Sequence, residues 1–505
     1  MLKHKTSICF SQDDLALFSK ASLDRNPLHL SDDYAHKTPF AKRVVFGVLG
    51  GIFCLGHLQN RPGLRLSQIT MEFPAPLFVD LPYSLEVVDT SPEKAVMRIY
   101  DGRRLMSKVT AYFQAGSPAR LKTTTAQATR SEAAVISLED LTTDISIEET
   151  YCPDANALRQ LTEPLHLLDK GVGELETSAL LWASYFVGME LPGCRALFSK
   201  LKLNFNDSLP NLAEPISYKA SLVQFDDRYN LLRTKVNLSA NSTPLASGSI
   251  QSFIRSNSPT VTTASIEELL PRSEALKGKV AFITGASRGL GAAIAQSLAL
   301  QGCTVLVNFL RSRSEAENLQ ATLADSPGEI VLMQGDAADL SWCLSAKQDI
   351  EDKYGTLDFL ICNACPAILP LWIEPSAIER LNEYAAKSLA LMSVPMSVFL
   401  DLVSDNLGWN VIISSIYASE FFPPELPHYV VSKFALEGLT QVAAAEYDQT
   451  NFLVVRPPKL LTDQTNTPIG QQGAIAAEKI AVKIVERLKE TPSTKPVEVM
   501  EAIWN

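Results

Sequence analysis

The stretch KVAFITGASRGLG, residues 279–291, joins a short apolar run to a turn that contains closely spaced glycines. Glycines in such a turn allow backbone N–H groups to approach a phosphate at the start of the following helix. Further apolar runs follow at helix-length intervals, at 303–309, 329–336, 357–364, 410–416, 451–457 and 496–502. Nearly continuous apolar strands separated by helices predict a parallel sheet covered on both faces. We therefore expect a doubly wound α/β domain over residues 276–505.

Residues 257–275 are rich in Ser, Thr and Pro, which predicts a linker to a differently patterned half. In that half, an apolar helix-like segment at 44–58 precedes alternating strand-like runs. A second apolar helix at 178–189 is again followed by strand-like runs. We expect a duplicated helix-on-sheet unit over 1–256, with repeats at about 1–116 and 135–256. The chain is thus predicted to be multidomain, with α+β and α/β parts.

Composition limits the functional classes. The 505 residues suggest about three folding units. A chain that is 46% hydrophobic and 20% charged is globular rather than disordered. A net charge of −11, with basic residues scattered along the chain, argues against nucleic-acid binding. The longest apolar stretch, 44–56, is too short to span a bilayer, so we expect no membrane contact and a cytoplasmic protein.

The eight cysteines include one C-x-x-C pair, Cys362 and Cys365. A structural zinc site needs a second pair or suitably placed histidines, and the nearest histidine in the sequence is His428. We expect reduced thiols and no metal site.

The glycine turn also reads G-x-S-x-G, the motif of a serine nucleophile at a strand-to-helix turn. Ser287 would then need a histidine base, and His428 is the one histidine that follows it in the chain. A hydrolase is therefore an alternative interpretation of this turn.

A second group of residues favours different chemistry. Ser414 and Ser415 end the run 410–416, and Tyr429 and Lys433 follow as Y-x-x-x-K. The i, i+4 spacing places the phenol and the ammonium on one helix face. An adjacent ammonium lowers a phenol pKa from about 10, which makes the phenol a usable proton donor. Ser415 can hydrogen-bond a carbonyl oxygen at the same point, so these residues predict proton transfer to a carbonyl.

In these motifs, residues 276–505 resemble the short-chain dehydrogenase/reductase family. The resemblance implies a Rossmann-type fold and catalysis by Ser415, Tyr429 and Lys433. Arg288, with no acid closing the second strand, favours a 2′-phosphate and hence NADPH as cofactor. The implied cofactor-binding residues are Gly285, Ser287, Arg288, Gly289, Gly291, Arg311, Asp336, Asn363 and Thr462.

This half also departs from the family pattern. The family's NNAG reads CNAC, so Cys362 and Cys365 replace an asparagine and a glycine. Counting back from Ser415 without gaps, Lys387 takes the position of the family's helical asparagine. A cofactor-binding domain with slow catalysis is the alternative that these departures leave open.

Near the N-terminus, SLDRNPLHLSDDYAHKTPF spans residues 22–40. Asp24 and His29, on either side of the Pro27 turn, can converge on one water molecule and exchange protons with it. Without further context, a helix-capping aspartate and a surface histidine would explain the same residues.

The segment D-x-N-P-x-H, followed by an apolar helix, resembles the MaoC-like hydratase/dehydratase family of hotdog folds. The resemblance implies that Asp24 and His29 add or remove water across the 2,3 double bond of an acyl thioester. Gly47 matches the glycine that precedes the central helix, whose N–H groups would polarise the thioester carbonyl. Phe46 stands where the family usually has histidine, which we expect to alter packing or pocket polarity. The second repeat has no such motif, and His166 is expected to be structural.

Together the two halves predict a bifunctional enzyme. It would reduce a 3-oxoacyl thioester with NADPH and dehydrate the product to a 2-enoyl thioester, in fatty-acid or polyketide-type biosynthesis. The expected partners are a substrate on coenzyme A or acyl carrier protein and, by family analogy, a second copy of the chain. The alternatives are hydration followed by oxidation, or an acyl-binding or assembly protein with one degenerate domain.

Overall fold

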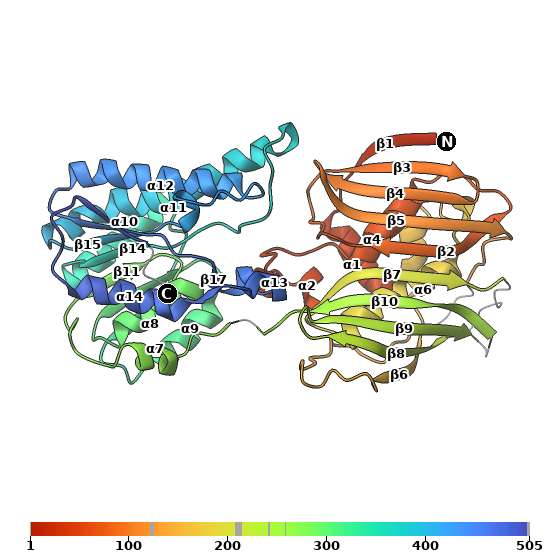
Figure 1. The fold of residues 1–505 in the computed structure, drawn as a ribbon, viewed down its shortest axis with the longest axis horizontal. Helices are drawn as coiled ribbons and strands as arrows, with labels where there is room; N and C mark the ends of the chain where they lie inside the picture. Colours follow the sequence, from red (N-terminus) through yellow and green to blue (C-terminus); the bar gives the residue numbers. More distant parts are fainter. Residues whose placement is uncertain (1, 122–125, 208–214, 241–242, 258, 502–505) are drawn as a thin grey trace. The chain divides into compact units, whose positions relative to one another are not determined.

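A computed structural model describes residues 2–121, 126–207, 215–240, 243–257 and 259–501 (Figure 1). The chain forms two compact units. The first comprises Met1–Asn257 and the short segment Thr467–Ile469, and the second comprises Ser258–Asn466 and Gly470–Asn505. Each unit has its own hydrophobic core and is described by itself.

The first unit contains a ten-stranded sheet in the order β1-β3-β4-β5-β2-β7-β10-β9-β8-β6. All of its strand pairs are antiparallel, and β2 pairs with β7 where the two repeats meet. The strands of the first repeat are β1 (Leu2–Ile8), β2 (Leu64–Glu72), β3 (Tyr83–Ser91), β4 (Lys94–Asp101) and β5 (Arg104–Ala115). Those of the second are β6 (Ser146–Tyr151), β7 (Ala196–Phe205), β8 (Ile216–Asp226), β9 (Leu231–Ala240) and β10 (Thr243–Ile254). The predicted duplication of a helix-on-sheet fold is confirmed.

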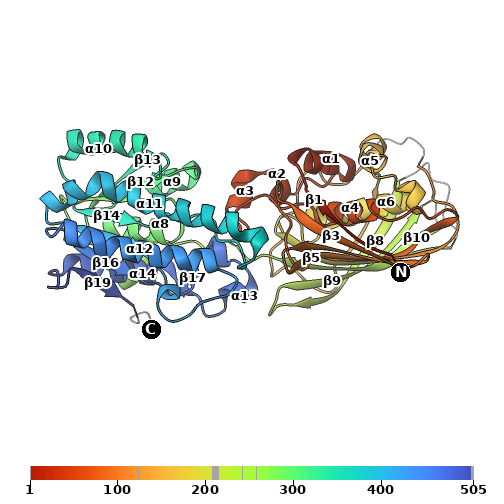
Figure 2. The same ribbon diagram turned by 90° about the horizontal axis from the view of Figure 1, so that it is seen from above.

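One long apolar helix from each repeat packs on the same face of this sheet (Figure 2). In α4 (Gly47–Gly56) a Cβ at Gly51 would lie 2.5 Å from Met71 Sδ, so glycine lets this helix approach β2 closely. Every residue of α6 (Glu174–Tyr185) is buried, and the helix continues into the π-helical turn η2 (Phe186–Glu190). π-helical turns are often found at functional sites.

Several elements of the first unit were not anticipated from the sequence. They are the edge strands β1 and β6, the helices α1 (Gln12–Ser22) and α5 (Ala155–Thr162), and the short turns α2 (Pro27–Leu30) and α3 (Asp32–His36). Ser11 and Asp14 form a capping box that starts α1. The D-x-N-P-x-H segment lies between α1 and α3, directly after the left-handed residue Leu23.

The second unit confirms the doubly wound prediction. Its seven parallel strands have the order β13-β12-β11-β14-β15-β16-β19. They are β11 (Val280–Ile283), β12 (Thr304–Phe309), β13 (Glu329–Gln334), β14 (Phe359–Cys362), β15 (Trp409–Ile413), β16 (Asn451–Val455) and β19 (Val497–Met500). The strand order reverses between β11 and β14. Ligands of such sheets bind at the carboxyl ends of the strands beside this switch point.

The helices of the second unit cover both faces of its sheet (Figure 1). They are α8 (Gly289–Ala299), α9 (Arg313–Thr322), α10 (Leu340–Tyr354), α11 (Ile378–Asp405), α12 (Pro427–Glu446) and α14 (Ala477–Lys489). The stretch 257–275, predicted as a linker, contains α7 (Thr263–Leu269), which packs on α8 and α14 through the fully buried Ile266. Residues Pro375–Asp405 are long and apolar enough to cross a bilayer, but α11 packs against α10, α12 and β14 as a covering helix of the sheet.

Candidate active sites

The glycine turn after β11 is shaped for close approach of a ligand. Gly285 has a φ of +65°, and a Cβ there would lie 3.0 Å from the Cα of Ala364. A Cβ at Gly291 would lie 2.5 Å from the carbonyl oxygen of Gly285. Asn363, after β14, donates from Nδ2 to the carbonyl oxygen of Gly285 at 2.9 Å, and its N–H donates to Thr284 Oγ1 at 3.0 Å. Asn363 therefore ties the two strand ends at the switch point together.

Other predicted cofactor residues also meet at this turn. Arg288 directly precedes α8, and its Nη1 lies 3.0 Å from a carboxylate oxygen of Asp463. Gly289 has a φ of +58°, and a Cβ there would lie 3.7 Å from Thr462 Cγ2. Ser287 is buried in the same turn. The short segment after β16 is thus brought to the glycine turn.

The end of β12 carries a neutral side chain where dinucleotide-binding folds often have an acid. Asn308 is buried, and its Nδ2 donates to the carbonyl oxygens of Met333 at 3.2 Å and Gly335 at 3.0 Å. Arg311 lies exposed just beyond β12. Asp336 accepts the N–H of Ala338 at 2.9 Å, which orders the turn after β13. The end of β12 therefore carries no carboxylate in the position where such folds often bind a ribose hydroxyl.

Ser415, Tyr429 and Lys433 meet at the end of β15. The Ser415 hydroxyl hydrogen-bonds Tyr429, and Lys433 Nζ lies 5.3 Å from the centre of the Tyr429 ring. Lys433 Nζ also donates to the carbonyl oxygen of Ile413 at 2.7 Å. The structure therefore brings the predicted catalytic set together.

The electrostatics of this set differ from the sequence expectation. Burial raises the pKa of Tyr429 above its ordinary value, and the Ser415 hydrogen bond opposes that rise. Burial also lowers the pKa of Lys433. The expected lowering of the phenol pKa is therefore not seen, because desolvation of the buried phenol dominates.

On α11, Tyr384 lies beside Tyr429 of the predicted catalytic set. Lys387, one turn later on the same helix, is exposed. The Tyr384 hydroxyl lies 3.4 Å from Cys365 Sγ, and its ring packs edge-on against His428 with 4.3 Å between the ring centres. His428 therefore packs against Tyr384, and among the described residues it makes no contact with Ser287. The hydrolase interpretation of the glycine turn gains no support. Cys362 is a buried free thiol at the end of β14.

In the first unit, Asp24 is almost fully buried, with 1% of its surface exposed. Its carboxylate accepts the N–H of Asn26 at 3.0 Å and the hydroxyl of Ser184 at 2.8 Å. Burial raises the pKa of Asp24 to about 7, against these two hydrogen bonds. The carboxyl group is therefore protonated in a substantial fraction of molecules near neutral pH.

His29, half-buried in α2, has the opposite bias. Its Nδ1 lies 2.6 Å from the carbonyl oxygen of Val44, so Nδ1 carries the proton and Nε2 is left as an acceptor. Burial lowers the pKa of His29 to about 4. Environments that push two pKa values apart in this way assign an acid and a base. Asp24 is suited to donate a proton and His29 to accept one.

Phe46 and Gly47 lie beside this pair. The Phe46 ring stacks on the His29 imidazole with 3.9 Å between ring centres, so Phe46 forms part of the packing around the imidazole. Gly47 begins α4, and a Cβ there would lie 3.0 Å from the Phe73 ring. The free N–H groups at this helix start can polarise a carbonyl oxygen.

Sequence reasoning missed the second repeat's contribution to the Asp24 site. Ser184 lies in the last turn of α6, and Gly188 lies in η2, where a Cβ would approach Asp24 Oδ1 to 2.4 Å. Asn26 Nδ2 donates to the carbonyl oxygens of Gly188 at 2.9 Å and Gly193 at 3.0 Å. In the sequence, the local signals for this contribution were Ser184 and Gly188, which interrupt the apolar run 178–189.

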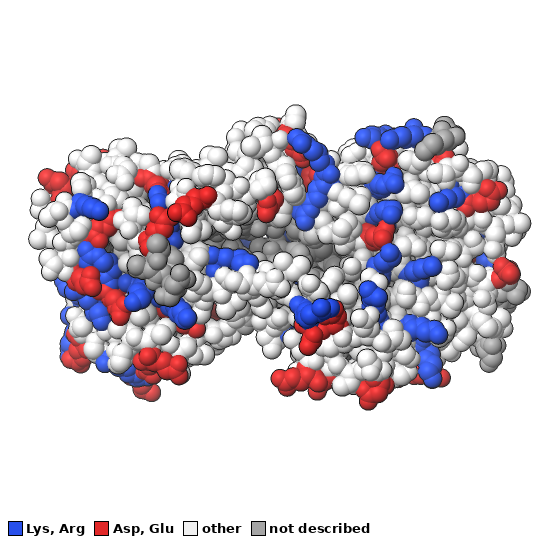
Figure 3. All heavy atoms as spheres, in the orientation of Figure 1, with Lys and Arg blue, Asp and Glu red and all other residues white. Residues whose placement is uncertain are grey.

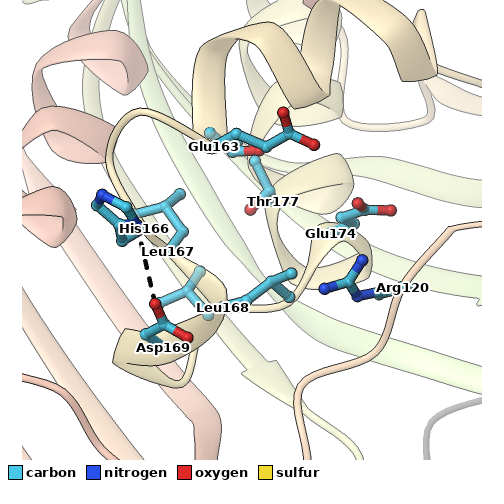
Figure 4. A pocket seen from close by; sticks show the side chains of 10 residues that line it. Arg120, Glu163, His166, Leu167, Leu168, Asp169, Glu174 and Thr177 are labelled. Atoms are coloured by element: carbon cyan, nitrogen blue, oxygen red, sulfur yellow. Dashed lines mark ion pairs between the residues drawn. The ribbon is translucent and has the colours of Figure 1, made fainter.

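A separate cavity of about 330 Å³ lies beside the start of α6 (Figure 4). His166 at its edge is exposed and lies 3.8 Å from Asp169, and Glu174 is bound by Arg159 at 3.1 Å. These charged groups pair with one another, and neither Asp24 nor His29 lines this cavity.

Comparisons with known proteins assign both halves. Residues 279–472 match the short chain dehydrogenase family, and residues 2–102 match the MaoC like domain. An uncharacterized oxidoreductase of Methylorubrum extorquens is 31% identical over 201 residues, which is 38% of this chain and 77% of that protein. A hydroxynaphthalene reductase of Aspergillus fumigatus is 31% identical over 174 residues, 34% of this chain and 62% of that protein.

Among solved structures, an alcohol dehydrogenase of Thermococcus sibiricus complexed with 5-hydroxy-NADP is similar to this chain. Its identity is 25%, its TM-score is 0.40, and the match covers 44% of this chain and 94% of that chain.

Proposed function

Because the chain belongs to the short-chain dehydrogenase family over residues 279–472 and carries a MaoC-like domain over residues 2–102, we propose that it converts a 3-oxoacyl thioester to a 2-enoyl thioester in two steps. The observation that carries the proposal is that one chain holds a Ser415, Tyr429 and Lys433 set in one domain and a buried Asp24 beside the His29 segment in the other. The two chemistries would then act on the same carbon. A reductase makes a hydroxyl group at C3, and a dehydratase removes it.

In the reductive step, NADPH when bound supplies the hydride. Ser415 orients the C3 carbonyl by a hydrogen bond, and Tyr429 gives its proton to the alkoxide oxygen. Lys433 holds a positive charge beside the phenol and would bind the ribose. Asn308 and Arg288 support the preference for NADPH, because neither would repel a 2′-phosphate.

In the second step, His29 Nε2 removes a proton from C2 and Asp24 protonates the departing C3 hydroxyl. The N–H groups at the start of α4 hold the thioester oxygen as negative charge develops there. After the elimination, Asp24 takes up a proton from solvent and His29 releases one to solvent, which restores the starting state. Dehydration is then fastest between the two pKa values, about 4 and about 7.

We further propose a cytoplasmic enzyme of fatty-acid or polyketide-type biosynthesis that works as a homodimer. Exposed apolar side chains on α12, Val431, Phe434 and Val442, support self-association of the second unit. No nucleic acid or membrane is expected as a partner. Hydration followed by oxidation is the reverse use of the same sites.

The test uses the N-acetylcysteamine thioester of 3-oxobutyrate with NADPH, followed by NADPH absorbance and product mass. We expect hydroxy product and then enoyl product. Tyr429→Phe should abolish NADPH oxidation while dehydration of added 3-hydroxybutyryl thioester continues, and Asp24→Asn should do the reverse. Loss of both steps in either variant would contradict two separate sites.

A further inference from the structure

The sheet of the first unit has one face covered by helices and one face that carries exposed polar side chains. The helices α1, α4, α5 and α6 all lie on the first face (Figure 2). Figure 3 shows that Lys and Arg side chains gather in rows across the second face. We call this second face the cationic face. It is unexpected in a chain whose net charge is −11.

Strand register builds the rows from residues that are far apart in the sequence. One row crosses β1, β3, β4, β5, β2 and β7 through Lys5, Glu86, Arg98, Lys108, Glu72 and Lys200. A second row places Lys202 opposite Ser249, and Ser249 opposite Lys235. Neighbouring strands lie about 5 Å apart, so Lys202 and Lys235 start about 10 Å from each other.

The carboxylates on this face do not neutralise it. Glu72 lies between Lys108 at 3.0 Å and Lys200 at 2.9 Å, so one acid faces two cations. Glu86 likewise has three cations within 4 Å. Lys202 and Lys235 are exposed and make no ion pair with any residue that the structure describes. Positive charge is therefore in surplus and available to a partner.

The alternation of cations and carboxylates on the cationic face favours one class of anionic partner over others. Glu72 and Glu86 interrupt the cations, which disfavours a regular polyanion such as nucleic acid or an anionic lipid surface. An acidic protein can instead place its carboxylates between those of the face. A helix presents them at i, i+3 and i+4, about 5–6 Å apart, which is close to the spacing of about 5 Å between neighbouring strands along each row.

We propose that the cationic face docks an acidic protein. Resting on the proposed function, this partner is the acyl carrier protein that bears the thioester, because a carrier that must bind and leave quickly gains most from electrostatic attraction. Coenzyme A would then be a poorer carrier of the same acyl chain.

The test compares dehydration of one acyl group on two carriers, 3-hydroxybutyryl acyl carrier protein and the neutral N-acetylcysteamine thioester. In the variant Lys202→Glu/Lys235→Glu we expect KM for the carrier-bound substrate to rise about tenfold or more at low salt. We expect kcat/KM for the neutral thioester to stay unchanged. A control variant with the same charge change in the second unit, Lys353→Glu/Lys483→Glu, should change neither value.

The outcomes separate the two proposals. No turnover of the neutral thioester by the unaltered enzyme would reject the proposed function. Turnover of both substrates, with carrier-bound KM unaffected by the reversals or by 0.5 M salt, would overturn the docking proposal. Binding of anionic vesicles or duplex DNA that is lost with the same reversals, without carrier binding, would also overturn it.

Discussion

The hydrogen bond from Ser184 to Asp24 offers a quantitative test of how burial sets the acid in the first unit. The hydroxyl lies 2.8 Å from the carboxylate oxygen in a site where both residues are buried. This bond favours the ionised form of Asp24, so Ser184→Ala should raise a pKa that already stands at about 7. A hydrogen bond to a charged group contributes about 1.5–3 kcal/mol, and each pKa unit corresponds to about 1.4 kcal/mol. We therefore expect a rise of about one to two units.

Because Asp24 must be protonated to release the hydroxyl, the alkaline limb of dehydration should move upward by the same amount. The assay is the pH profile of kcat/KM for a 3-hydroxyacyl N-acetylcysteamine thioester, followed by absorbance of the enoyl product. Ser178→Ala is the matched control, since its hydroxyl lies on the same helix but donates to the carbonyl oxygen of Glu174 at 2.7 Å. An alkaline limb that stays in place or moves downward in Ser184→Ala, or that moves equally in the control, would refute the assignment of Asp24 as the acid.

Three further outcomes are expected. Gly188→Ala should reduce dehydration about a hundredfold, because the added Cβ would meet Asp24 Oδ1 at 2.4 Å. NADPH oxidation, assayed separately, should be retained. Arg288→Ala should raise KM for NADPH about tenfold or more and leave KM for NADH unchanged, as measured by initial rates. Asp24→Asn should stabilise the first unit by up to about 4 kcal/mol at pH 8 in thermal or urea unfolding. The pKa of Asp24 is raised in the folded state, so stability is lost as pH rises towards 7, and the advantage of the variant should vanish near pH 4.

The architecture and both catalytic motifs were readable in the sequence because they depend on local order. Apolar runs such as 279–285 and 303–309 report burial of strands on both faces. Asp24 and His29 lie within one turn of chain, and Tyr429 and Lys433 lie on one helical face. Short-range geometry of this kind follows from residue spacing alone.

What only the tertiary structure decided depends on contacts between distant residues. Ser184 and Gly188 reach Asp24 across about 160 positions, because β2 pairs with β7 and brings the second helix against the first repeat. Burial, which no spacing reveals, sets the pKa of Asp24 and reverses the expected effect on Tyr429. The basic residues that look scattered in the sequence become rows on one face, since strand register aligns residues such as Lys108 and Lys200 that are far apart along the chain.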